Sequence, residues 1–259
     1  MTTPAPSPSP SPGTRSRRSR KWWYIGGAFV LVLALAGFGI WYFVFRDDSP
    51  PGVNIERASE SLDSRESGKA QPASAVDGTW TVDRSIGTFA DFTSSFAGYR
   101  VQEELASVGA KTAVGRTPDV DGSFTIDGKK IPKAEFTVDM STLKSDEDLR
   151  DGAIRGQAIE TSRFPTATFT LTKPIALDQI PAEGKKISVD ATGDLTLHGV
   201  TKEVTIPLAA QRTANVIALT GQLDIPFADF QIAQPTSFAV LSIEDHGILE
   251  IQLFLTRTT

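Results

Sequence analysis

Residues 187–209 read ISVDATGDLTLHGVTKEVTIPLA, two segments in which apolar and polar residues alternate. One side of both segments is apolar or small throughout, at Val189, Ala191, Gly193, Leu195, Leu197, Val204, Ile206 and Leu208. A period of two residues is typical of a β-strand with one buried face. His198-Gly199 lies between the segments and suits a tight turn, because such turns need residues that tolerate positive φ. The stretch therefore predicts an antiparallel hairpin with one apolar face.

The same alternation recurs through residues 77–259, where helical periodicity is weak. Strands are expected at 79–83, 95–103, 122–126, 134–140, 166–172, 187–197, 204–209, 216–225, 238–243 and 248–255. Asp127-Gly128 and Asp245-His246-Gly247 mark two further hairpin turns. Eight or more such strands predict an all-β domain, either a closed barrel or a sandwich. Closure is the complete way to hide the strand edges.

One segment interrupts the pattern. Residues 145–161 (SDEDLRDGAIRGQAIET) are rich in charge and poor in β-branched side chains. We expect a long loop with one helical turn, which crosses one mouth of the barrel.

The first 76 residues have a different composition. Prolines alternate with small residues over 1–14 and five positive charges follow, so residues 1–21 are expected to form a disordered cytoplasmic tail. Residues 22–45 carry no charge, and a helix over 25–45 is about 31 Å long, which matches a bilayer core. We expect one transmembrane helix over 22–46 and a flexible, polar stem over 47–76.

The charges that precede the span predict a single-pass protein of the cell membrane with a cytoplasmic N-terminus. The β-rich domain over 77–259 is then extracytoplasmic. The alternative is a cleaved signal peptide, with Ala34-Leu35-Ala36 before Gly37 as the cleavage site. Cleavage there would leave the apolar stretch FGIWYFVF at the new N-terminus, which favours an uncleaved anchor.

Composition also narrows the chemistry. The chain has no Cys and two His, which excludes disulfides, thiolate metal sites and cysteine nucleophiles. His198 and His246 fall in different hairpins, and no GxSxG, SxxK or HExxH motif is present. Residues 1–21 carry +5 of the net charge of −5, so the remainder carries −10 and is a poor partner for nucleic acid. We expect no enzyme activity, no metal and no cofactor.

Three motifs follow one another in the β-rich part: DMSTLKSD (139–146) leading to Leu149-Arg150-Asp151, ETSRFPTATF (160–169) and GDLTLHGVTK (193–202). Together they resemble the YceI-like family of lipocalin-like, isoprenoid-binding barrel proteins, over about residues 77–259. The resemblance implies an exported, eight-stranded antiparallel barrel that holds a polyprenyl or other lipid chain. Many members carry two histidines in an early strand. Here the comparable stretch is SSFAGYRVQE (94–103), with Glu103 near the position of the second.

The barrel interior is the expected ligand site, because eight strands leave room either for side chains or for one ligand. The interior and mouth residues expected to contact the ligand are Tyr99, Val101, Phe136, Val138, Phe164, Phe169, Leu195, Leu197, Leu219, Leu223 and Leu253. Small inward residues, Ala134, Gly193 and Gly221, either leave space for the ligand or only pack the core.

Three polar residues are candidates for contacts with a ligand head group: Glu103, Arg150 and His198. Two of them, His198 and Arg150, also have another interpretation. His198 also suits a turn, and Arg150 can form an ion pair with Asp151 or face a phosphate or quinone oxygen.

The sequence thus predicts a membrane-tethered protein that holds a polyisoprenoid- or quinone-like lipid for sequestration or transport. Its expected partners are this apolar lipid and, through residues 22–46, the membrane. One alternative is an extracytoplasmic scaffold that binds a protein and no lipid. Another is an enzyme on an isoprenoid substrate, with His198, Glu103 or Asp139 transferring a proton.

Overall fold

The computed structural model describes residues 24, 31–39, 41–42, 46–47, 49–66, 76–178, 180, 182–237 and 240–258. The chain divides into two compact units, residues 1–46 and 47–259. The predicted tail over 1–21 and about half of the predicted span over 22–46 lie outside the described residues. Among the residues described, no helix combines the length and the apolar character needed to cross a bilayer.

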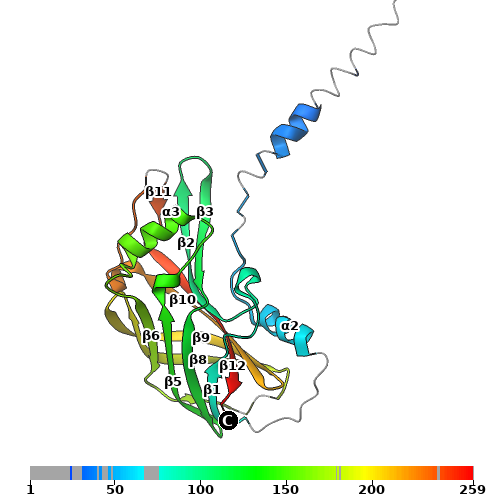
Figure 1. The fold of residues 1–259 in the computed structure, drawn as a ribbon, viewed down its shortest axis with the longest axis vertical. Coiled ribbons are helices and arrows are strands. Elements are labelled where there is room, and N and C mark those ends of the chain that lie inside the picture. The colour runs from blue at the N-terminus through cyan, green and yellow to red at the C-terminus, as the bar shows by residue number, and fades with distance from the viewer. Residues whose placement is uncertain are drawn as a thin grey trace, which may run out of the picture. The chain divides into compact units, whose positions relative to one another are not determined.

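Eight antiparallel strands of the second unit close into a barrel (Figure 1). In ring order they are β1 (Gly78–Val82), β4 (Val120–Asp127), β5 (Lys130–Asp139), β6 (Thr166–Leu171), β8 (Lys186–Leu197), β9 (Val200–Thr213), β10 (Val216–Pro226) and β12 (His246–Arg257). The ring closes because β1 pairs with β4 on one side and with β12 on the other, where Trp80 lies opposite Arg257. The predicted closed, eight-stranded antiparallel barrel is confirmed.

Two of the predicted hairpin turns are confirmed. Between β8 and β9, Leu197 pairs with Val200, and His198 and Gly199 both have positive φ, at 52° and 73°. Between β4 and β5, Gly128 has a φ of 55°. These turns set the register that directs alternate residues of each strand into the barrel.

Three further strands extend one end of the barrel: β2 (Phe96–Leu105), β3 (Gly109–Thr117) and β11 (Val240–Ile243). β2 pairs with β12, with β3 and with β11. β3 was not predicted, because its sequence GAKTAVGRT has only one bulky apolar residue and no clear alternation. A two-residue strand, β7 (Ile175–Ala176), pairs with β5 and was also not predicted.

The hairpin predicted at Asp245-His246-Gly247 is wrong. β11 and β12 do not pair with each other; both pair antiparallel with β2, Ile243 opposite Glu103 and Ile248 opposite Arg100. The chain therefore runs on along β2 with an interruption between the two strands. Asp245-His246-Gly247 has the composition of a turn, but the pairing of both strands with β2, far away in the sequence, determines the direction of the chain here.

Residues 145–161 form more helix than the single turn expected. α3 (Asp148–Ala153) continues directly into a π-helical turn, η3 (Ile154–Ala158). Short 3₁₀ turns precede β2, α3 and β11: η1 (Phe89–Asp91), η2 (Met140–Thr142) and η4 (Phe227–Phe230). α3 lies at the end of the barrel where β2, β3 and β11 extend (Figure 1).

The prediction of a flexible stem over 47–76 is wrong for residues 55–66, which form α2 (Ile55–Glu66). The side chain of Asn54 accepts hydrogen bonds from the backbone N–H groups of Glu56 and Arg57, as an N-cap does. The buried side of the helix packs in one cluster with the barrel strands, and consists of Ile55, Ala58 and Leu62 against Val216, Ala218 and Phe254. Three apolar residues at helical spacing are a weak signal in a polar segment, and their partners lie more than 150 residues away.

Candidate functional site

The barrel encloses a cavity of about 490 Å³, within the range of ligand sites. Its walls are almost entirely apolar. Ten of the eleven predicted interior residues line it: Tyr99, Val101, Phe136, Val138, Phe169, Leu195, Leu197, Leu219, Leu223 and Leu253. Strand alternation places the eight that lie on barrel strands there, because every second residue of a barrel strand faces inward. Tyr99 and Val101 lie on β2, which extends the barrel at one end.

Phe164, the eleventh, is not among the lining residues. Its ring packs against the imidazole of His198, with ring centroids 4.7 Å apart. A Cβ atom on Gly199 would lie 2.4 Å from the Phe164 ring, so the ring fits here only because residue 199 has no side chain. The ring of Phe164 therefore packs on the β8–β9 turn and does not form part of the cavity wall.

The small inward residues do not all serve the cavity. A Cβ atom on Gly193 would lie 2.6 Å from the ring of Phe169, and one on Gly221 would lie 2.6 Å from Leu208. Those two glycines accommodate neighbouring side chains of the barrel. Ala134 and Gly221 line the cavity, whereas Gly193 is not among its lining residues.

One end of the cavity is polar. Glu103 on β2 is buried and its carboxylate accepts a hydrogen bond from Arg150 on α3, with Nη2 and Oε1 2.7 Å apart. Burial alone would lower the pKa of Arg150, but the hydrogen bond and charge of Glu103 outweigh it and raise that pKa. Both residues line the cavity, as predicted, and they form an ion pair with each other.

The predicted ion pair between Arg150 and Asp151 is not formed. Arg150 also binds Asp146, one helical turn before it. Asp151 instead accepts hydrogen bonds from the backbone N–H and the hydroxyl of Ser145, at 2.8 and 2.7 Å. Residues adjacent on a helix point in different directions, which is why the neighbours 150 and 151 find different partners.

The hydroxyl of Tyr99 is buried and has no hydrogen-bond partner among the described residues. Its ring lies over Gly115 of β3, where a Cβ atom would come within 2.3 Å. Burial raises the pKa of the phenol, so the group is neutral at ordinary pH. An unpartnered buried hydroxyl costs about 1–3 kcal/mol, and a polar group of a ligand could supply the missing bond. At the other end of the cavity the Nε of Arg212, a residue that sequence analysis missed, is likewise without a partner in the described chain.

His198 is a turn residue, and it does not line the cavity. Its Nδ1 lies 3.0 Å from the carbonyl oxygen of Phe230 and its Nε2 lies 3.0 Å from the carboxylate of Glu160. Hydrogen bonds from His198 and Arg163 lower the pKa of Glu160. The imidazole thus connects the β8–β9 turn to η4 and to the end of the helical segment, and the structure does not place it for a ligand head group.

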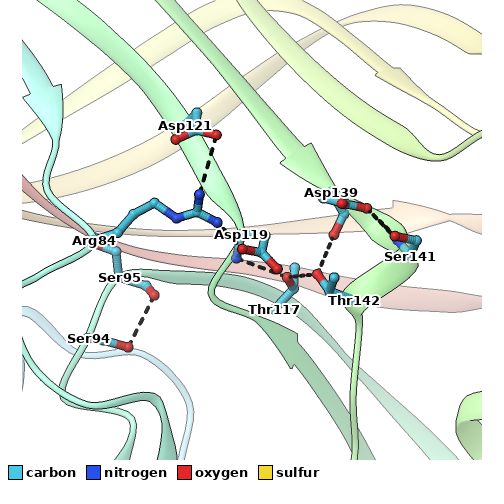
Figure 2. A network of polar contacts seen from close by, with 9 residues as sticks. All are labelled: Arg84, Ser94, Ser95, Thr117, Asp119, Asp121, Asp139, Ser141 and Thr142. Atoms are coloured by element: carbon cyan, nitrogen blue, oxygen red, sulfur yellow. Dashed lines mark hydrogen bonds and ion pairs between the residues drawn. The ribbon is translucent and has the colours of Figure 1, made fainter.

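Asp139 also has a structural role. Its carboxylate accepts hydrogen bonds from the N–H and hydroxyl of Ser141, which lower its pKa. Figure 2 shows the surrounding network, which runs through Thr142 and Thr117 to Asp119 and then to Arg84. These contacts hold the η2 turn to the β3–β4 turn. His198, Glu103 and Asp139 therefore each bind separate structural partners, and the described residues contain no group of three metal-binding side chains.

Comparison with known proteins matches residues 80–255 to the profile of the YceI-like domain. A UPF0312 protein of Pseudomonas aeruginosa is 34% identical over 151 residues, which cover 57% of this chain and 70% of that protein. A UPF0312 protein of Vibrio vulnificus is 33% identical over 156 residues, which cover 55% and 77%. A polyisoprenoid binding domain from Saccharophagus degradans has a similar structure, with a TM-score of 0.52 and 21% identity over 70% of this chain and 99% of that one. At that identity the likeness is one of fold.

Proposed function

The chain belongs to the YceI-like domain family, and from this membership we propose that its barrel binds a long apolar lipid of polyisoprenoid or quinone type. The observation that carries the proposal is the cavity of about 490 Å³ with apolar walls. Burial of methylene groups contributes about 0.8 kcal/mol each, so about ten of them contribute about 8 kcal/mol before the entropic cost of association. Affinity therefore needs few polar contacts.

The polar groups at the α3 end of the cavity give such a ligand an orientation. The hydroxyl of Tyr99 lacks a partner, and Glu103 and Arg150 line the same cavity. A ligand with a hydroxyl, carbonyl or phosphate at one end would place that group here and its hydrocarbon chain along the barrel. Replacing Tyr99 by Phe is then expected to weaken binding of such a ligand while leaving the fold intact.

We further propose that the protein is exported and tethered to the cell membrane by residues 22–46, with its barrel outside the cytoplasm. Five positive charges precede an uncharged segment of bilayer length, which supports this orientation. Sequestration or transport of the lipid next to the membrane follows as the role. We propose that the protein is not an enzyme, because the candidate acid–base residues Asp139, His198 and Glu103 each bind a structural partner.

The experiment is to identify the lipid that co-purifies with the full chain, by organic extraction and mass spectrometry. Two substitutions at adjacent positions of β5 make the comparison specific. Ala134 lines the cavity, so Ala134→Phe fills it; Glu135 is exposed, so Glu135→Phe adds the same ring outside.

We expect an apolar lipid that is enriched with the unsubstituted chain and with Glu135→Phe, and that is depleted with Ala134→Phe. Lipid levels that are equal in all three proteins would mean that the cavity is not the binding site. A protein partner captured without any enriched lipid would instead support the scaffold alternative.

A further inference from the structure

Two large apolar side chains stand out on the surface of the second unit. Leu149 of α3 is 75% exposed and Leu241 of β11 is 65% exposed. Exposed leucines are common singly, but these two lie on neighbouring elements: β11 pairs with β2 at Leu105 and Glu103, and Arg150 of α3 binds Glu103. Both therefore lie at the same end of the barrel (Figure 1).

The cavity opens at this end. Its lining includes exposed residues of the α3 segment and of the chain before β11, namely Glu147, Leu149, Thr236 and Ser237. At the opposite end the lining consists of buried or half-buried side chains such as Ile126, Ile175 and Leu177. Leu149 and Leu241 thus stand at the rim of the opening.

The chain also enters the second unit at this end. Asp47, its first residue, accepts a hydrogen bond from the hydroxyl of Thr112 on β3 at 2.7 Å. The carbonyl of Pro51 accepts one from Arg116 at 2.9 Å, and that of Pro50 accepts one from Arg100. Asp47, Pro50 and Pro51 are therefore held along β2 and β3. Thr112 is three residues from Gly109 at the tip of the β2–β3 hairpin, a distance of about 10 Å along a strand.

We propose that the end of the barrel carrying Leu149 and Leu241 docks on the lipid bilayer, with the mouth of the cavity against the membrane surface. This inference rests on the proposed function, because it takes residues 22–46 as the membrane span. The span ends one residue before Asp47, and a chain extends by at most about 3.6 Å per residue, so Asp47 lies within about 4 Å of the end of the span. A lipid could then pass between bilayer and cavity without crossing bulk water.

The contact is apolar in character. Asp146, Glu147 and Asp148 precede Leu149 and are exposed, so attraction to anionic lipids does not drive it. Two leucines bury little area, but the anchor makes docking an intramolecular event at high effective concentration. Docking should therefore persist at high salt, which screens surface charge.

The test uses the full chain in phosphatidylcholine vesicles that contain head-group nitroxide lipids. The chain has no cysteine, so Leu241→Cys can be labelled alone with an environment-sensitive fluorophore. Leu241 is not a cavity-lining residue, so its label reports the outside. Ile180→Cys is the matched control, because Ile180 is another exposed apolar residue and follows β7, whose partner Lys130 begins β5 at the opposite end.

We expect the label at 241 to be quenched several-fold more than the label at 180, at low and high salt. Adding Leu149→Asp to the labelled Leu241→Cys chain should reduce that quenching toward the level at 180. Equal quenching at 241 and 180 overturns docking, even if the label is shielded by a protein or by a second copy. Lipid extracted from the same samples separates the two proposals: bound lipid without quenching at 241 overturns docking alone. A chain that does not float with the vesicles overturns the anchor, and docking with it.

Discussion

At the scale of single residues, the barrel depends on a buried ion pair between Glu250 and Arg116. Glu250 of β12 is 1% exposed, and its carboxylate lies 2.6 Å from Nη2 of Arg116. The Arg116 guanidinium also lies over the rings of both Phe92 and Phe96, 4.3 and 4.4 Å from their centroids. With the carbonyl of Pro51 as a further acceptor, this one cation joins β2, β3, β12 and the segment before α2.

We predict that Glu250→Gln lowers the free energy of unfolding by about 3–5 kcal/mol, because it leaves the buried Arg116 without its counter-charge. Chemical denaturation followed by circular dichroism measures this. The control is Glu203→Gln, whose partner Lys173 is exposed, with an expected change below about 1 kcal/mol. Similar losses in both variants would contradict the assignment.

The pairing of His198 with Glu160 predicts a dependence on acid. The pKa of Glu160 is lowered in the folded protein from an ordinary value of 4.5, so its ionised form stabilises the fold above that pH. This contribution is lost as pH falls below 4.5 through the lowered pKa. We expect Glu160→Gln to flatten the pH dependence of the unfolding free energy below about 4.5, measured by chemical denaturation at a series of pH values; an unchanged slope would contradict this.

At the scale of elements, the buried faces of the barrel strands follow from the local sequence, whereas the buried face of α2 depends on a distant strand. Each strand of the barrel carries its own two-residue alternation, and Phe136, Leu195 and Leu219 line the cavity as that alternation predicts. α2 carries only three buried apolar residues, and its place depends on the outer side of β10, where Val216 and Ala218 are buried as well. Residues 216–221 of β10 are thus buried on both faces, which an isolated hairpin pattern does not reveal.

For α2 we predict that Leu62→Ala lowers the free energy of unfolding by about 2–5 kcal/mol, because Leu62 is buried against the barrel. It should also speed hydrogen exchange of the backbone amides over 55–66. Glu60→Ala removes an exposed side chain of the same helix and should change neither quantity much. Exchange over 55–66 that is already fast in the unsubstituted protein would show that the helix is not docked.

At the scale of the whole molecule, barrel closure depends on a short strand. β1 has five residues, yet it pairs with β4 and with β12 and so joins the two edges of the sheet. Trp80 at its centre is buried in the cluster that contains Phe124 and Leu255, and its indole N–H donates to the carbonyl of Val76 at 2.9 Å. The Trp80 side chain therefore packs the strand that closes the barrel into the hydrophobic core.

We predict that Trp80→Ala destabilises the protein by about 3–5 kcal/mol and depletes the co-purified lipid, because an opened barrel no longer encloses the cavity. Unfolding curves and lipid extraction measure the two effects. Thr79→Ala, an exposed position on the same strand, should change stability by less than about 1 kcal/mol and retain the lipid. If the Trp80→Ala protein retained its lipid, closure of the barrel by β1 would not be required for lipid binding, and this prediction would be wrong.

Local sequence patterns predicted the eight barrel strands, their inward faces and the two turns at Gly128 and Gly199, because alternation and a tolerance of positive φ are properties of neighbouring residues; they did not predict β3 or β7. Contacts between distant residues determine that β11 continues beside β2, that Arg150 pairs with Glu103 and not with Asp151, and that α2 covers β10. Such contacts also place the ring of Phe164 against the β8–β9 turn and the ring of Phe169 against Gly193. Each of these depends on contacts between residues far apart in the chain, and no local pattern encodes which distant side chain fills a given space.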